Sequence, residues 1–165
     1  MSGKSTNAGL LVLPLLLTAF ILLIGYLAPR LVVSTTPSLP HTVFWRTDKP
    51  VTKLMLGDYC HFAPPASISW QHLPTVPNPM FIKRASCMPG QQLVRQGEHF
   101  YCDGQYIATA LKRRQSLERY PSFTWDGPVP AGQVFVTGSH PQSLDSRYFG
   151  FVSLTAINEI LKGVL

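Results

Sequence analysis

A serine between two prolines is the first side chain in this sequence that could do chemistry. Ser38 lies in the run Ser34-Thr-Thr-Pro-Ser-Leu-Pro40, where Pro37 and Pro40 restrict the backbone to extended conformations. A serine hydroxyl is a weak nucleophile until a neighbouring base takes its proton. Ser38 is therefore a candidate nucleophile only if the fold brings a base to it.

Histidine is the commonest base, but the histidines here stand in no catalytic pattern. None lies in a nucleophile elbow or in a zinc-binding H-E-x-x-H sequence, and surface or partly buried histidines outnumber catalytic ones. We expect no metal site and no cofactor. The five histidines are at positions 41, 61, 72, 99 and 140.

Lysine offers a second kind of base. Lys83 lies in Phe81-Ile-Lys-Arg-Ala-Ser86, a predicted strand whose apolar neighbours would desolvate the ammonium group and favour the neutral amine. A neutral amine can accept the proton of a serine, as in a Ser/Lys dyad. An exposed strand lysine is the commoner alternative, and the local sequence alone does not decide between the two.

An apolar stretch before Ser38 determines where such a site would lie. No charged residue occurs from Ser5 to Pro29, and the run Leu10 to Leu27 is long enough, at about 1.5 Å per residue, to cross the hydrocarbon core. A cleaved secretory signal is the alternative, but its apolar core is about 7–15 residues long and a small-x-small site follows it. No such site follows Tyr26. We expect an uncleaved transmembrane anchor over residues 10–28.

The rest of the chain has the composition of one small β domain. The whole chain has 165 residues, 13% of them charged, which excludes both a disordered chain and two sizeable enzyme domains. Asp103-Gly104 predicts a tight hairpin turn. Residues 156–164 are the only predicted helix after the anchor. Strands are expected at Thr42–Arg46, Tyr59–Phe62, Phe81–Ser86, Gln92–Arg95, Phe100–Cys102, Tyr106–Thr109, Gln133–Gly138 and Gly150–Ser153.

Three further features leave alternatives open. Cys87 and Cys102 could form a disulfide in an oxidising compartment, with Cys60 unpaired, or all could be buried thiols. The basic residues of Lys112-Arg-Arg114 with Arg119 could contact phosphates, but a solvated loop is commoner and no nucleic acid is expected. The tryptophans could form a membrane-interface patch or fill the core. They are Trp45, Trp70 and Trp125.

Several segments, in order along the chain, resemble the conserved boxes of type I signal peptidases. The last is the most specific, since Ser143-x-Asp-Ser-Arg-Tyr-Phe-Gly150 is hard to obtain by chance. The small size, the Pro-Pro after Phe62 and the short connection before the last box resemble the conjugative-transfer, TraF-type branch that processes pilin precursors. The boxes are Ser38 after the anchor, Gly57–Phe62, Phe81–Gly90 and Gly132–Gly150.

The resemblance implies a role for each matching polar residue. Ser38 would be the nucleophile and Lys83 its general base, while Ser143 would hydrogen-bond the lysine amine and orient it. Thr36 would supply a hydroxyl as a hydrogen-bond donor to the oxyanion hole, beside the Ser38 backbone N–H.

The resemblance also implies a setting for the site. Asp145 and Arg147 lie two residues apart on one strand-like face and would form a pair that braces the last box. From the sequence alone, a solvated charge pair is equally expected. The fold would be mainly β, an antiparallel domain of coiled sheets or a partial barrel with an N-terminal transmembrane helix and a short C-terminal helix. Residues 1–9 would be cytoplasmic and residues 29–165 a periplasmic serine peptidase domain on the inner membrane. Charge counting alone leaves this orientation open.

The sequence departs from the family pattern at three places. Leu39 follows the nucleophile where the family has Met, an apolar exchange that should preserve packing. Gly138-Ser-His-Pro141 replaces a Gly-Asp-Asn type sequence and removes a carboxylate. Gln91 follows Pro89-Gly90 where the family has Asp.

The expected function is cleavage of exported precursor proteins at the bilayer, most directly the maturation of a conjugative pilin. A peptide amine in place of water could join the ends of the pilin, and the sequence does not distinguish the two outcomes. A catalytically inactive, anchored assembly factor of a conjugation or secretion apparatus is the alternative, supported by the altered Gly138–Pro141 segment. A DNA-handling protein is a weaker alternative, and it would require DNA binding that depends steeply on salt.

Overall fold

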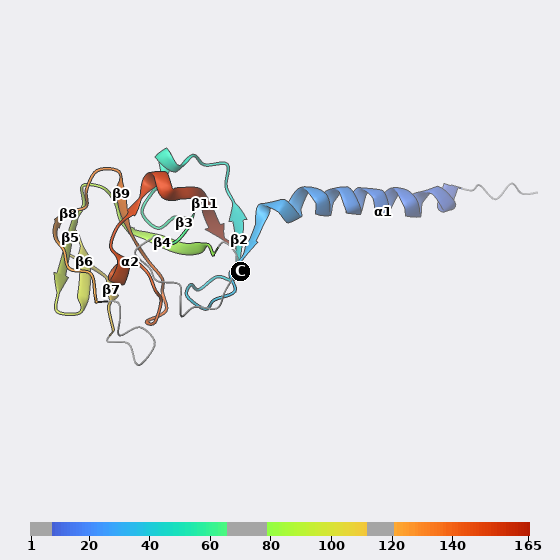
Figure 1. Cartoon of the computed structure of the whole chain (residues 1–165). Helices are drawn as coiled ribbons and strands as arrows, with labels where there is room; N and C mark the ends of the chain where they lie inside the picture. Colours follow the sequence, from blue (N-terminus) through green and yellow to red (C-terminus); the bar gives the residue numbers. More distant parts are fainter. Residues whose placement is uncertain (1–7, 66–78, 112–120) are drawn as a thin grey trace, which may run out of the picture.

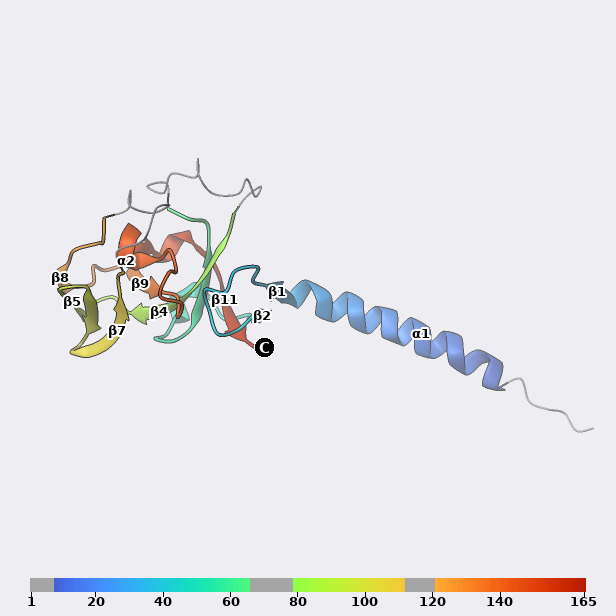
Figure 2. The same cartoon turned by 90° about the horizontal axis from the view of Figure 1, so that it is seen from below.

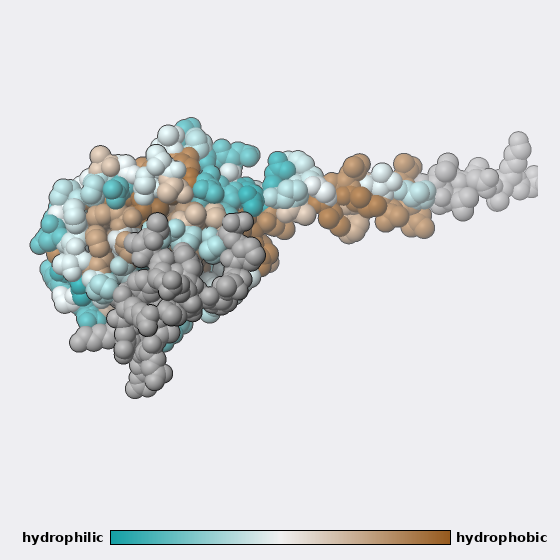
Figure 3. Space-filling model, in the orientation of Figure 1, coloured by the Kyte–Doolittle hydropathy of each residue, from teal (hydrophilic) through white to brown (hydrophobic). Residues whose placement is uncertain are grey.

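A long apolar helix precedes a β domain in the computed structural model, which describes residues 8–65, 79–111 and 121–165. The helix, α1 (Ala8–Leu27), continues into a 3-10 turn at Ala28–Arg30. Figures 1 and 2 show it extending away from the domain, and Figure 3 shows hydrophobic residues along it. Within the described residues it is the one helix long and apolar enough to cross a membrane, with a mean hydropathy of 2.3 over Val12–Arg30.

A seven-stranded antiparallel sheet forms most of the domain. Its strand order is β1-β2-β11-β3-β4-β9-β10, so β11, from the end of the chain, lies between two strands from the first half. This crossover brings the end of the chain next to the segments that follow α1. The strands are β1 (Leu31–Val33), β2 (Val43–Arg46), β3 (Tyr59–Phe62), β4 (Phe81–Cys87), β9 (Gln133–Thr137), β10 (Val152–Ser153) and β11 (Ile157–Gly163).

A second, four-stranded sheet has the order β7-β6-β5-β8. Asp103 and Gly104 form the turn between β6 and β7 with φ values of 48° and 77°, which confirms the predicted hairpin. The strands are β5 (Gln92–Gln96), β6 (His99–Cys102), β7 (Gln105–Thr109) and β8 (Asp126–Pro128). Further 3-10 turns lie at Val51–Lys53 and Leu154–Ala156. The short helix α2 (Ser146–Phe149) precedes β10.

The mainly β fold is confirmed, but the helix expected over residues 156–164 is wrong. That segment forms β11, which pairs with β2 on one side and β3 on the other. A register shift between Ile157 and Glu159 places Ile157, Ile160 and Leu161 in the core. Because this bulge adds a residue to the strand, the buried positions follow the i, i+3, i+4 spacing of a helix. The short helix after the anchor is α2.

Among the residues that the structure describes, three apolar clusters form the core. One includes Phe62, Val134 and Ile160 on the seven-stranded sheet, and the second joins Leu93 and Phe100 of the small sheet to Phe135 of the large one. Trp125 belongs to the second cluster, where it packs edge-on against Phe151. Trp45 is partly buried on β2, opposite Leu31. Trp70, residues 1–7, the proline-rich 73–78 stretch and the basic 112–119 segment lie outside the described residues.

A disulfide joins Cys87 at the end of β4 to Cys102 at the end of β6 and so links the two sheets. Both cysteines are buried, and Cys60 is a free thiol with no exposed surface. Burial, with a smaller effect from the charge of Asp58, raises the pKa of Cys60 to about 12. The thiolate, which is the reactive form, is therefore suppressed in the folded chain at neutral pH.

The cysteines are expected to react in a fixed order. At pH 8, below the raised pKa of Cys60, an alkylating reagent should label no cysteine of the folded chain. Unfolding without reductant should expose Cys60 alone, and unfolding with reductant should expose all three cysteines. Intact-protein mass spectrometry counts the labels. Two or more labels on the unfolded, unreduced chain would show that the disulfide had not formed.

Candidate active site

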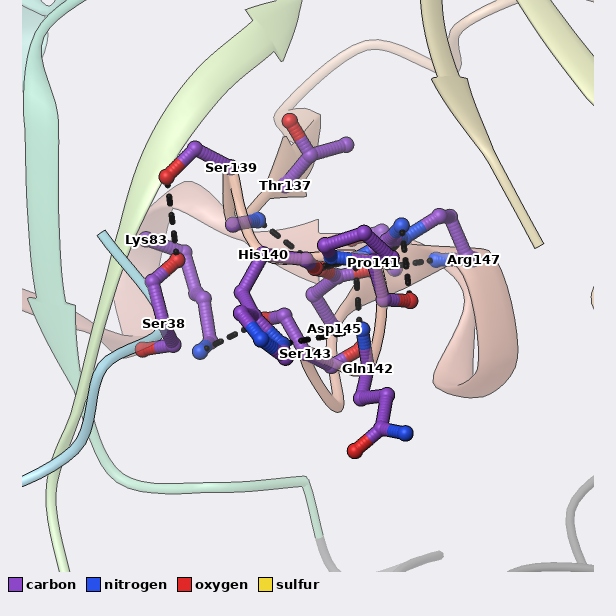
Figure 4. Close-up of polar contacts among 12 residues, drawn as sticks. Ser38, Lys83, Thr137, Ser139, His140, Pro141, Gln142, Ser143, Asp145 and Arg147 are labelled. Atoms are coloured by element: carbon purple, nitrogen blue, oxygen red, sulfur yellow. Dashed lines mark hydrogen bonds and ion pairs between the residues drawn. The ribbon is translucent and has the colours of Figure 1, made fainter. Parts of the chain in front are cut away.

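The serine and lysine expected to react come from different parts of the seven-stranded sheet. Ser38 lies in the loop between β1 and β2 and is partly exposed, whereas Lys83 is the third residue of β4 and its side chain is buried. The Lys83 amine donates a hydrogen bond of 2.9 Å to Ser143 Oγ, which is also buried. In Figure 4 this amine lies between Ser38 and Ser143.

Lys83 is buried among apolar and aromatic side chains. The amine lies 5.3 Å from the ring centre of Phe81, and the strand neighbours Ile82 and Ala85 are buried apolar residues. The buried amine is held by its hydrogen bond to Ser143 on one side and packs over the aromatic ring of Phe81 on another.

The loop that follows β9 holds the backbone of Ser38. The carbonyl oxygen of Ser38 accepts hydrogen bonds from the N–H of Ser139 at 2.9 Å and of His140 at 3.3 Å. The Ser139 hydroxyl adds a contact at 3.5 Å, drawn in Figure 4. On the other side of Ser38, Thr36 Oγ1 lies 3.2 Å from Ser38 Oγ, within hydrogen-bonding distance. The structure thus brings Thr36, Ser38, Lys83 and Ser143 together.

Gly138 lies where these segments meet. A Cβ at this position would be 2.6 Å from the Ser38 carbonyl oxygen and closer still to Ser143 Oγ. The N–H of Gly138 donates to Asp145 Oδ2 at 2.8 Å. Because its φ is not in the left-handed region, Gly138 is required for the close approach of its neighbours and not for its own backbone conformation.

Gly138→Ala is expected to slow catalysis strongly. The new methyl group would displace the Ser38 backbone or Ser143, and a misplacement near 1 Å can cost about 100-fold in rate. Overpacking of this kind also destabilises by about 1–3 kcal/mol. Precursor processing and thermal unfolding of the full chain measure the two effects. Gly25→Ala, the same change in α1 where nothing lies within 4 Å, is the control. If Gly138→Ala processed the precursor as fast as Gly25→Ala does, the expected steric crowding at position 138 would be contradicted.

Asp145 and Arg147 form a buried ion pair at the start of α2. The expectation that they lie on a strand-like face is wrong, and so is the alternative of a solvated pair. Asp145 is the N-cap of α2, and its side chain accepts from the Arg147 N–H at 3.1 Å. The guanidinium donates to both carboxylate oxygens, Nε at 2.8 Å and Nη2 at 2.6 Å. The exposed fractions are 0% for Asp145 and 2% for Arg147, because the chain turns into a helix here and buries both residues.

Arg147 also binds the loop that contacts Ser38. Its guanidinium donates to the carbonyl oxygens of His140 at 3.1 Å, Ser143 at 3.2 Å and Thr109 at 2.8 Å. Burial alone would lower the pKa of Arg147, but the hydrogen bond to Asp145 and its charge outweigh burial and raise the pKa. Arg147 therefore stays charged and fixes the 140–143 segment through its carbonyl groups.

The departures from the family pattern can be followed in the structure. Leu39 is buried in an apolar cluster with Phe44, Ile82 and Leu161. Gln91 closes the turn after β4, because its Oε1 accepts a hydrogen bond from the Met88 N–H at 2.8 Å. The contact of the Ser139 amide with Ser38 was not expected, and no side-chain signal in the sequence could have revealed a backbone donor.

The fold defines a class of protein: a β-rich domain that follows an apolar helix long enough to span a membrane. Among the described residues, no three His, Cys, Asp or Glu side chains lie together as metal ligands would. A family model described as "Signal peptidase, peptidase S26" matches residues 5–162. The chain belongs to this family. It is accordingly a membrane-anchored serine peptidase that cleaves exported precursors.

A solved structure is also similar to this chain. It is a signal peptidase I from Enterococcus faecalis V583, with 25% sequence identity and a TM-score of 0.43 over 67% of this chain and 97% of the other. No curated protein matches the sequence.

Proposed function

We propose that this peptidase works through Ser38 as nucleophile and Lys83 as general base. The observation that carries the proposal is the buried hydrogen bond of 2.9 Å between Lys83 Nζ and Ser143 Oγ beside Ser38. Ser143 orients the amine by accepting one of its N–H bonds, which directs the lone pair elsewhere. Asp145 and Arg147 hold the loop that carries Ser143.

The proposed reaction transfers an acyl group twice. Lys83 takes the proton of Ser38 Oγ as this oxygen attacks the scissile carbonyl carbon, and the carbonyl oxygen becomes negatively charged. When the C–N bond breaks, the Lys83 ammonium returns the proton to the leaving amine. Water, deprotonated by the same amine, then hydrolyses the ester on Ser38 and regenerates the hydroxyl.

Thr36 is proposed to stabilise the oxyanion with the Ser38 N–H. Its hydroxyl lies 3.2 Å from Ser38 Oγ and would turn toward the new negative charge. Thr36→Val is therefore expected to lower kcat by about 100- to 1,000-fold with little change in KM, because the donor acts only in the transition state. Steady-state kinetics on a precursor peptide measure this split. Thr36→Ser keeps the hydroxyl and should keep most activity; equal losses in both variants would contradict the role.

We further propose a setting on the periplasmic face of the inner membrane, with residues 1–9 in the cytoplasm, 10–28 spanning the bilayer and 29–165 as the catalytic domain. The Cys87–Cys102 disulfide supports this setting, since disulfides persist in oxidising compartments. Ser38, about ten residues beyond the anchor, would be held close to the bilayer surface. A precursor that is itself in the membrane would present its scissile bond at this depth.

The proposed substrate is a conjugative pilin precursor, by the sequence resemblance to the TraF-type branch. The purified full chain in lipid vesicles, mixed with such a precursor, should produce a shortened pilin. Mass spectrometry of the product distinguishes hydrolysis from cyclisation, because a ring is one water lighter than the linear chain. A precursor that stays intact would favour the alternative, an inactive assembly factor.

A further inference from the structure

The loop that carries Ser38 is closed by contacts from the end of the chain. The N–H of Ser34 donates to the Thr42 carbonyl at 2.8 Å and forms the stem of the loop. The N–H groups of Thr42 and Val43 both donate to the carbonyl oxygen of Leu165. In return the Val164 N–H donates to the Val43 carbonyl at 2.9 Å. Figures 1 and 2 both show the end of the chain beside β2.

A glycine of β11 makes room for a side chain of this loop. A Cβ on Gly163 would lie 2.6 Å from His41 Cγ, 2.7 Å from Nε2 and nearer still to Cδ2. Gly163 is not among the glycines with positive φ, so its backbone would accept alanine. The His41 ring packs edge-on against the rings of Phe44 at 6.1 Å and Tyr59 at 5.7 Å. It therefore has apolar neighbours on two sides and the Gly163 backbone on another.

The residue next to Ser38 also rests on β11. Leu39 is 7% exposed and shares a cluster with Phe44, Ile82 and Leu161, the last of which belongs to β11. The loop is thus fixed through Leu39, His41 and the N–H groups of its stem. From the opposite direction, the Ser139 N–H binds the Ser38 carbonyl at 2.9 Å.

We propose that Gly163–Leu165 form a clamp that positions Ser38 for attack. The inference rests on the proposed role of Ser38, and none of the clamp residues would touch the substrate. Gly163 leaves room for the His41 ring, and the carbonyl oxygen of Leu165 fixes the backbone at Thr42 and Val43. Loss of the clamp would leave the loop held only by the Ser34–Thr42 bond, the packing of Leu39 and the contact with Ser139, so Ser38 Oγ would spend less time in the geometry that reacts.

The test is Gly163→Ala in the full chain in detergent micelles. Amide hydrogen exchange, followed by mass spectrometry, should become faster in residues 34–43 while β3 and β4 stay protected. In parallel, kcat for a precursor peptide should fall by about 10- to 100-fold with KM nearly unchanged. Lys162→Ala, at an exposed position of the same strand, should match the unchanged chain in both measurements.

A second substitution makes the test specific. His41→Ala removes the ring that the new methyl group would strike, so Gly163→Ala should change exchange and kcat far less in the His41→Ala background than in the unchanged chain. Unchanged exchange in residues 34–43, or a loss on Gly163→Ala that is as large in the His41→Ala background, would overturn the clamp. Hydrogen exchange reports on the order of the loop whether or not the chain is catalytically active. A chain whose exchange behaves as expected but whose kcat is insensitive to Ser38→Ala would refute the role of Ser38, and would leave only the ordering of residues 34–43 by the end of β11 standing.

Discussion

Ser38→Ala and Lys83→Ala are each expected to abolish precursor processing while the chain stays folded and in the membrane. Ser38→Ala removes the attacking oxygen, and Lys83→Ala removes the group that takes its proton. Losses for the members of such catalytic units are on the order of 10⁴-fold or more in kcat. The double variant should be no worse than either single one, because neither residue acts without the other.

Lys83→Arg separates the base from the positive charge. Arginine remains protonated, so this variant could still donate to Ser143 but could not accept a proton, and it should be inactive as well. Lys53→Ala, at an exposed position, is the matched control. Conversion of the precursor, followed by gel electrophoresis and product mass, measures each rate. Processing at the control's rate by Ser38→Ala or by Lys83→Ala would remove the proposed mechanism.

Asp145→Ala is expected to cause the largest loss of stability. It leaves the Arg147 guanidinium, 2% exposed, without its counter-ion, and it removes the N-cap of α2 and the acceptor of the Gly138 N–H. Breaking one partner of a buried pair costs about 3–5 kcal/mol. For a domain of this size the expected fall in Tm is on the order of 10 °C.

The comparison that isolates burial is an exposed ion pair of the same chain. Arg46 contacts Glu159 at 2.8 Å with 44% of its side chain exposed, so Arg46→Ala should cost no more than about 1 kcal/mol. Thermal unfolding of the two variants, monitored by circular dichroism, gives the difference. If Asp145→Ala were as stable as Arg46→Ala, the buried pair could not be what fixes the loop after β9.

The sequence predicted the strands whose pattern is local. Tyr59–Phe62 alternates partly and fully buried residues and has the bounds of β3, and Asp103-Gly104 gave the position of one hairpin. Strands β1 and β8 were missed because three residues are too few to show a period. The error at β11 has another cause, since its bulge gives a strand the apolar spacing of a helix.

The site was predictable in residue type and not in geometry. The resemblance suggested Ser38, Lys83 and Ser143, but the burial of Lys83 depends on the pairing of β4 with β3 and β9. The crowding at Gly138 arises from two loops that meet only in the folded chain. Backbone donors and acceptors, such as the Ser139 N–H, carry no signature in the sequence.

The most direct test of the account is acylation of Ser38 itself. The full chain in detergent micelles is treated with a mechanism-based serine acylator, digested, and the adduct is located by peptide mass spectrometry. We expect one adduct, on Ser38, which is absent in Ser38→Ala and forms far more slowly in Lys83→Ala. An unlabelled Ser38, or labelling at the same rate without the Lys83 amine, would contradict a lysine-activated serine nucleophile.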